Sequence, residues 1–215
     1  INGGEIKTIR YGAAILATGA QESVPTEFMY GKDSRIMTHL EFEDKLKQTP
    51  DLAKTAQSAV FIQCVGSRNK ERPYCSRLCC THSVKNAVDL KTENPDMNVY
   101  ILYRDMRTYG TREDLYTTAR KMGVIFIRYD LENPPEVCLE GGDLMVRVTD
   151  PILGLPLTLE TDYLVLAAAI VPNETKELVE LYKCAVNEDG FLNEAHPKLR
   201  PVDMSVDGLF LAGIC

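Results

Sequence analysis

Apolar runs alternate with amphipathic segments through the middle of the chain. Four runs rich in β-branched and aromatic residues predict buried strands, at residues 59–65, 98–103, 124–129 and 163–169. The spacing of apolar residues between the first three runs predicts helices at 76–91 and 112–122, the second ending at Gly123. Strands and helices that alternate at these lengths predict right-handed crossovers and a parallel sheet covered by helices.

The segments on either side of this central unit predict smaller elements. Thr38 and Glu41 have the spacing of a capping box, which predicts a helix at 39–47. Three runs joined by a Gly-Gly turn and a Pro-bounded loop predict an antiparallel meander, at 136–140, 144–148 and 157–160. We further expect short strands and helices elsewhere, with strands at 4–10, 13–17, 191–192 and just before Gly213, and helices at 51–57 and 174–182.

Composition and charge narrow the class of protein. The chain has 215 residues, 45% of them hydrophobic and 26% charged, which is ordinary for a globular protein with one domain or one and a half. A net charge of −7 without a basic run argues against nucleic acid as a partner. No apolar stretch has membrane-spanning length, and no signal peptide is visible. Because the chain starts without Met and stops after LAGIC, we expect a piece of a longer protein.

Cysteine carries the candidate chemistry. Seven cysteines, clustered and odd in number, favour a reducing cytoplasm over a secreted disulfide scaffold. Cys64, Cys75, Cys79 and Cys80 form a C-x10-C-x3-C-C pattern where the first central strand passes into its helix. Cys64 ends the strand at the edge where parallel sheets bind ligands. Cys75 and Cys79 are four residues apart and would share a face on a helix, whereas Cys79 and Cys80 would diverge by about 100°.

Four thiolates around a body of cluster size are typical of a cubane iron–sulfur centre, whose charge nearby cations would offset, namely Arg68, Arg77 and Lys85. Two other uses of the cysteines stay open. One is a redox disulfide pair, and the other is a zinc site, although zinc usually takes paired C-x2–4-C knuckles. Cys138 and Cys184 are expected to be small buried hydrophobic residues. His39 and His82 are expected to be structural or exposed rather than metal ligands.

The segments QCVGSR and YCSRLCCTHSVKNA resemble the A subunit of heterodisulfide reductase and its relatives in sulfate reducers. That family consists of flavoproteins with the thioredoxin-reductase fold. The resemblance implies an α/β fold of the two-dinucleotide-domain flavoprotein type, whose Rossmann-like three-layer domain has a parallel sheet plus an antiparallel β-meander. It also implies a [4Fe-4S] cluster held close to a flavin by four cysteines, which here are Cys64, Cys75, Cys79 and Cys80. The function implied is electron transfer in a complex with other subunits, one of which donates electrons.

The resemblance extends to the flavin motifs at both ends of the chain. The turn Thr18-Gly19-Ala20 and the segment VDGLFLAGIC resemble FAD-binding motifs, which implies that Thr18, Gly19 and Gly213 contact the FAD of a complete protein. Ile214 stands where the family has an aspartate, and the first FAD motif is missing, so we expect this chain alone to bind flavin poorly. Lys85, one and a half turns beyond Cys80, is a candidate positive charge facing the flavin.

The resemblance implies four segments along the chain. They are the end of a split FAD domain at 1–22, a connecting loop and helix at 23–58, a domain like the NAD(P) domain at 59–171, and a truncated return to the FAD domain at 172–215. Of the glycines in G-x-G-x-x-G, only Gly66 follows the first central strand, so we expect no NAD(P) site. The alternatives kept open are an NAD(P)H-dependent disulfide oxidoreductase that uses a cysteine pair and a zinc-stapled interaction module.

Overall fold

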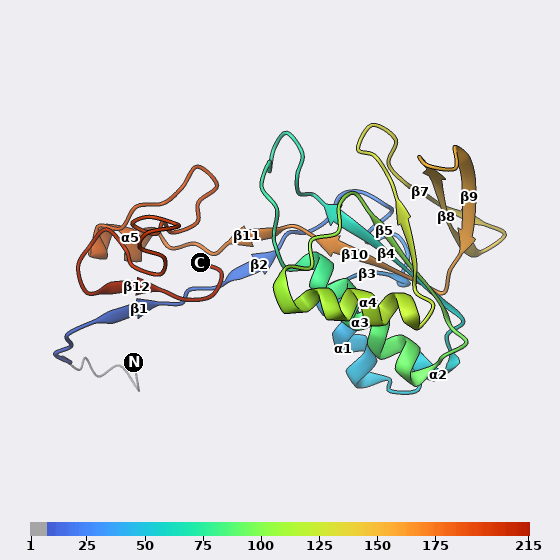
Figure 1. Cartoon of the computed structure of the whole chain (residues 1–215), viewed down its shortest axis with the longest axis horizontal. Helices are drawn as coiled ribbons and strands as arrows, with labels where there is room; N and C mark the ends of the chain where they lie inside the picture. The colour runs from blue at the N-terminus through green and yellow to red at the C-terminus, as the bar shows by residue number, and fades with distance from the viewer. Residues whose placement is uncertain (1–7) are drawn as a thin grey trace. The chain divides into compact units, whose positions relative to one another are not determined.

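A computed structural model describes residues 8–215 of the chain (Figure 1). The described residues divide into a larger unit, Glu22–Ala169, and a smaller one built from 8–21 and Ile170–Cys215. Residues 23–58, which we expected as a connector, supply elements to the larger unit. Within residues 8–215, no helix has both the length and the apolar character needed to cross a bilayer.

The larger unit is built on a five-stranded parallel sheet. Its strand order is β3-β10-β4-β5-β6, with β3 at Ile36–Thr38, β10 at Tyr163–Ala168, β4 at Ser58–Val65, β5 at Asn98–Tyr103 and β6 at Ile125–Arg128. The four predicted strands are confirmed to within one residue at each end. Strand β3 was not predicted, because three residues are too few to show a periodicity.

Helices cover one face of this sheet and the meander covers the other (Figure 1). The helices are α1 at His39–Gln48, α2 at Leu52–Thr55, α3 at Cys79–Glu93, the 3-10 turn η1 at Gly110–Arg112 and α4 at Glu113–Lys121. The predicted capping box is present, since Thr38 and Glu41 bond reciprocally at the start of α1. The predicted meander is confirmed as an antiparallel sheet of β7 at Glu136–Glu140, β8 at Asp143–Asp150 and β9 at Leu155–Glu160.

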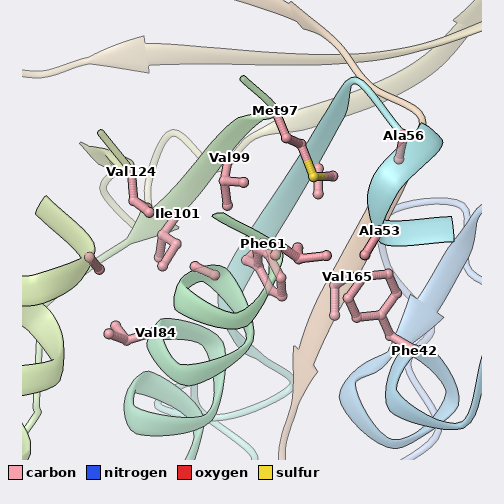
Figure 2. Close-up of a cluster of buried hydrophobic side chains, with 14 of the residues drawn as sticks. Phe42, Ala53, Ala56, Phe61, Val84, Met97, Val99, Ile101, Val124 and Val165 are labelled. Atoms are coloured by element: carbon pink, nitrogen blue, oxygen red, sulfur yellow. The ribbon is translucent and has the colours of Figure 1, made fainter. Parts of the chain in front are cut away.

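Each face of the parallel sheet has its own apolar core. On the helix side, Phe61 of β4 packs with Phe42 of α1 and Val84 of α3 (Figure 2). On the meander side, Val60 and Ile62 of β4 pack with residues of β8. Because successive side chains of a buried parallel strand point to opposite faces, β4 must be apolar at nearly every position, as its sequence SAVFIQCV is. Apart from Ser58 at its first position, the exceptions Gln63 and Cys64 come at its carboxyl end.

The smaller unit contains shorter elements. Strands β1 (Ala14–Leu16) and β12 (Leu209–Leu211) pair in parallel, and helix α5 spans Lys176–Tyr182. Strands β2 (Ala20–Glu22) and β11 (Ile170–Pro172) form a second pair.

Three predictions for these shorter elements need correction. The strand expected at 13–17 is shorter, at Ala14–Leu16, and its apolar run is not buried throughout, since Ile15 is 68% exposed. The expected strand 191–192 is reduced to an isolated bridge between Val186 and Leu192. The expected strand 4–10 lies mostly outside the described residues, and its last three positions form no strand.

Candidate metal centre at the cysteine cluster

The four cysteines of the C-x10-C-x3-C-C pattern line one small cavity in the larger unit. They come from the end of β4, from the loop 66–78 and from the first turn of α3 (Figure 1). The helix was predicted to start at residue 76, but it begins at Cys79, so Cys75 lies in the loop and does not share a helix face with Cys79. The loop is longer than the predicted turn because Arg77 has φ +63°, which a right-handed helix does not allow.

Strand β4 changes its register next to Cys64. Leu166 of β10 pairs with Ile62 and Ala168 pairs with Val65, so three steps on β4 oppose two on β10. Cys64 lies in this bulge with φ +62°, in the left-handed region that non-glycine residues rarely adopt. A bulge changes the direction in which a side chain points, and bulges are common beside functional sites. The irregularity therefore explains how a residue of a regular buried strand faces the cysteine cavity.

Arginines surround the cavity and are held in place by a carboxylate. Arg68 Nη1 lies 3.8 Å from Cys64 Sγ, and Arg68 Nη2 donates to Asp105 Oδ2 at 2.5 Å. Arg107 Nη2 lies 3.6 Å from the same Asp105 oxygen. The backbone amide of Arg77 donates to Cys75 Sγ at 3.4 Å. Two of the four sulfur atoms thus already face hydrogen-bond donors, which suits sulfur that carries negative charge.

The other two sulfur atoms point apart, as predicted for adjacent cysteines. Cys79 Sγ lies 3.7 Å from Ala168 O, and Cys80 Sγ lies 3.7 Å from Asp105 O. Burial raises the pKa of Cys79 to about 12 and that of Cys80 to about 11, and it also raises the pKa of Cys64. As bare thiols these groups are protonated at neutral pH and react slowly as nucleophiles. A bound metal reverses this situation, because coordination replaces the thiol proton.

The donor set of this cavity consists of four cysteine thiols. Within residues 8–215, no three His, Cys, Asp or Glu side chains converge closely enough to hold a single metal ion. Nevertheless, four cysteines line one cavity together with arginine side chains. Four thiolates spread around a shared space are the ligand set of a cubane cluster, which carries net negative charge.

The candidate flavin residues lie in two places. In the smaller unit, β1 and β12 run parallel in register, so the turn at Thr18 and Gly19 and the turn at Gly213 leave the same sheet edge. Gly19 and Gly213 both have positive φ, and Asn173 Nδ2 donates to Thr18 O at 2.8 Å. Thr18 Oγ1 is buried without a hydrogen-bond partner among the described residues. An unsatisfied buried hydroxyl beside two glycine turns fits a site that a ligand completes.

The remaining candidate residues lie away from the cysteine cavity. Lys85 in the larger unit pairs with Asp89 at 2.6 Å on the exposed side of α3. Cys138 lies on β7 and lines a separate cavity of about 630 Å³, which also reaches Cys64. Cys184 packs against the core of the smaller unit. His39 is buried and bonded to Ser83, and His82 pairs with Glu43, so both histidines have structural partners as expected.

Sequence reasoning missed the residues that follow β5. Asp105 and Arg107 line the cysteine cavity, although they lie far from the cysteine motif in the sequence. The signal was available, because β5 neighbours β4 and the carboxyl ends of adjacent parallel strands meet at one edge. Arg104, the first residue after β5, has a different role. Its guanidinium donates to Ser67 O and Arg68 O and so fixes the loop rather than facing the cavity.

Comparisons with known proteins bear on the fold and the family of the chain. No protein-family model matches the chain. Thioredoxin reductase from T. acidophilum matches with a TM-score of 0.55 and 17% identity over 94% of this chain and 56% of that one. The flavoprotein disulfide reductase RclA from Escherichia coli matches with a TM-score of 0.54 and 16% identity over 94% of this chain and 39% of that one. The fold is therefore that of the thioredoxin-reductase-like flavoproteins.

Sequence relatives are more specific. The A subunit of the H(2):CoB-CoM heterodisulfide,ferredoxin reductase from Methanothermobacter thermautotrophicus is 38% identical over 96% of this chain and 34% of its own length. One of the iron-sulfur A subunits of CoB–CoM heterodisulfide reductase from Methanopyrus kandleri is 36% identical over 98% of this chain and 35% of its own length. The resemblance found in the sequence is confirmed: the chain is homologous to part of the A subunit of heterodisulfide reductase and spans about a third of its length.

Proposed function

We propose that this chain is the cluster-bearing and flavin-contacting part of an electron-transfer subunit in a heterodisulfide-reductase-like complex. The observation that carries the proposal is the convergence of Cys64, Cys75, Cys79 and Cys80 on one cavity with hydrogen-bond donors facing the sulfur atoms. The relatives support it, since they are named as subunits of heterodisulfide reductases and three of them as iron-sulfur subunits. Seven free cysteines suit a reducing compartment such as the cytoplasm.

In this proposal the protein supplies position and charge. The four cysteines hold a [4Fe-4S] cluster, which when bound accepts and passes on single electrons. Arg68 donates toward Cys64, and Asp105 fixes that arginine and Arg107 beside the cavity. Both cations compensate the negative charge that four thiolates bring into a partly buried site. The flavin of the complete protein would contact Thr18, Gly19 and Gly213. That Lys85 places a positive charge facing this flavin stays a prediction.

The first test is the metal content of the chain itself. Purified without oxygen, or reconstituted with iron and sulfide, the chain is expected to bind about four iron atoms and to show a broad visible absorption band. Iron, sulfide and zinc analysis of the same sample is the measurement. Stoichiometric zinc without iron would exclude the cluster and favour the zinc-stapled module. Handling in air is expected to release the cluster, so an aerobic sample serves as the comparison.

A disulfide reductase driven by NAD(P)H is the second candidate, and a cavity is the observation in its favour. About 630 Å³ opens beside Gly66 and Arg104, at the sheet edge where such folds bind nucleotides. Against it, α3 begins only after the loop 66–78, so no helix starts directly after β4 to receive a pyrophosphate. The raised thiol pKa values of Cys79 and Cys80 also disfavour a reactive pair.

We therefore expect the chain to bind NADH and NADPH too weakly to measure at micromolar concentrations. Titration calorimetry of the folded chain with each nucleotide is the direct measurement. A dissociation constant in the low micromolar range, which corresponds to a binding free energy of about −8 kcal/mol, would contradict this prediction. It would make the loop 66–78 part of a nucleotide site instead of a metal site.

A further inference from the structure

A chain of buried polar side chains lies directly behind the cysteine cavity, on the helix side of the sheet. Gln63 of β4 and Ser83 of α3 are fully buried, and His39 of α1 is 2% exposed. Gln63 Nε2 donates to Ser83 Oγ, and Ser83 Oγ lies 2.6 Å from His39 Nε2. The surrounding core is apolar. Three elements are thus joined by hydrogen bonds where apolar side chains of similar size would fill the same space.

The charge state of His39 limits the directions that these hydrogen bonds can take. Burial, with a smaller effect from the neighbouring His82, lowers the pKa of His39 to about 3, so its imidazole is neutral. A neutral imidazole has one ring nitrogen that accepts and one that donates, so in the tautomer with an unprotonated Nε2 Ser83 donates its hydroxyl proton there while it accepts from Gln63. The single hydroxyl of Ser83 therefore orients both partners at once.

Gln63 and Ser83 both lie next to the cysteines, so their hydrogen bond connects the two elements that carry Cys64, Cys79 and Cys80. Gln63 directly precedes Cys64, and Ser83 lies on α3 within one turn of Cys79 and Cys80. On the opposite face of the sheet, Tyr129 Oη donates to Gln63 O at 2.5 Å. Gln63 is therefore held from both faces at the point where β4 changes its register.

We infer that the hydrogen-bonded chain Gln63–Ser83–His39 is a positioning device, which fixes the bulge at Cys64 and the first turn of α3 relative to each other. A non-glycine residue at positive φ costs about 1–3 kcal/mol and persists only where its surroundings determine it. Apolar contacts are non-directional and hold α3 against the sheet without fixing the bulge. Directional hydrogen bonds to the residue beside Cys64 supply that constraint.

Ser83 can hold the bulge at Cys64 with or without a bound cluster, so the two effects are tested separately. The first part, that Ser83 holds the bulge at Cys64, concerns the metal-free chain and does not depend on any cofactor. The second part, that this sets the geometry of a bound cluster, rests on the proposed function. The experiment compares Ser83→Ala with Ser83→Thr, which keeps the hydroxyl, and with Val84→Ala, which removes a neighbouring apolar group from the same helix (Figure 2).

The metal-free arm measures amide hydrogen exchange at 63–66 relative to 99–102 in β5. In Ser83→Ala the exchange ratio is expected to rise about tenfold, because one buried hydrogen bond to the bulge is lost. Ser83→Thr should restore the ratio. Val84→Ala should lower global stability without changing the exchange ratio. An unchanged ratio in Ser83→Ala, or an equal rise in Val84→Ala, would overturn the first part of the inference.

The loaded arm measures the rate at which the anaerobic, iron-loaded chain releases iron to a chelator, and the electron paramagnetic resonance of the reduced sample. Ser83→Ala is expected to release iron about tenfold faster and to shift the resonance, whereas Ser83→Thr and Val84→Ala should behave like the unaltered chain. Identical release rates in all variants would overturn the second part. A chain that binds no iron would refute the proposed function, while the exchange ratio would still decide the first part.

Discussion

Replacement of Cys64 by Ala is expected to remove most of the iron from the anaerobic chain while the fold stays intact. Cys64 is the one proposed ligand that comes from a central strand, and the other three come from the loop and the start of α3. Without Cys64 the cluster loses its attachment to the sheet. The fold persists because the apolar neighbours of Cys64 on β4, which are fully buried, still pack on both faces.

Iron analysis and circular dichroism of the single variants are the measurements. Cys138→Ala and Cys184→Ala are the matched controls, because Cys138 lies on β7 and Cys184 in the smaller unit, and both should keep their iron. Cys64→Gly should lose iron like Cys64→Ala but be more stable by about 1 kcal/mol, since glycine adopts positive φ without cost. If Cys138 or Cys184 proves necessary and Cys64 dispensable, the ligand assignment is wrong.

Much of the larger unit could be predicted because its strands are both long and apolar. Strands β4, β5 and β10 have no other reasonable interpretation, and the capping box at Thr38 fixes the start of α1. The smaller unit was harder to predict. A strand such as β1 has three residues, and its exposed Ile15 follows no burial pattern that a sequence window can detect.

The composition of the cysteine site was readable from the spacing, but its geometry was not. The register shift at Cys64 arises from pairing with β10, a hundred residues away in the sequence, and no local pattern encodes it. The same holds for Ser83 and Gln63, which look like ordinary polar residues of a helix and a strand. Their hydrogen bond exists only because α3 packs across β4. Local periodicity thus predicts elements, whereas tertiary packing decides where their side chains point.

The stability of the chain is expected to fall steeply in mild acid because of His39. The folded chain holds this imidazole neutral, with a pKa lowered from 6.5 to about 3 by burial and by the neighbouring His82. The unfolded chain has an ordinary histidine there, so between these two pH values it binds one proton more than the folded chain. Lowering the pH therefore favours unfolding, by up to about 1.4 kcal/mol for each pH unit.

Urea unfolding of the metal-free chain at several pH values between about 7 and about 4.5 measures this dependence. His39→Gln is the informative variant, because a glutamine oxygen can still accept from Ser83 but cannot bind a proton. Glu22 is half-buried and has a raised pKa because of this partial burial, which acts in the opposite direction. Because Glu22 is present in both the unaltered chain and His39→Gln, its contribution cancels when their unfolding free energies are subtracted. The difference in unfolding free energy should change by about 1.4 kcal/mol per pH unit, with the unaltered chain losing stability faster as the pH falls. Parallel curves for the two chains would mean that His39 is charged in the folded state, and Ser83 would then have to accept from His39.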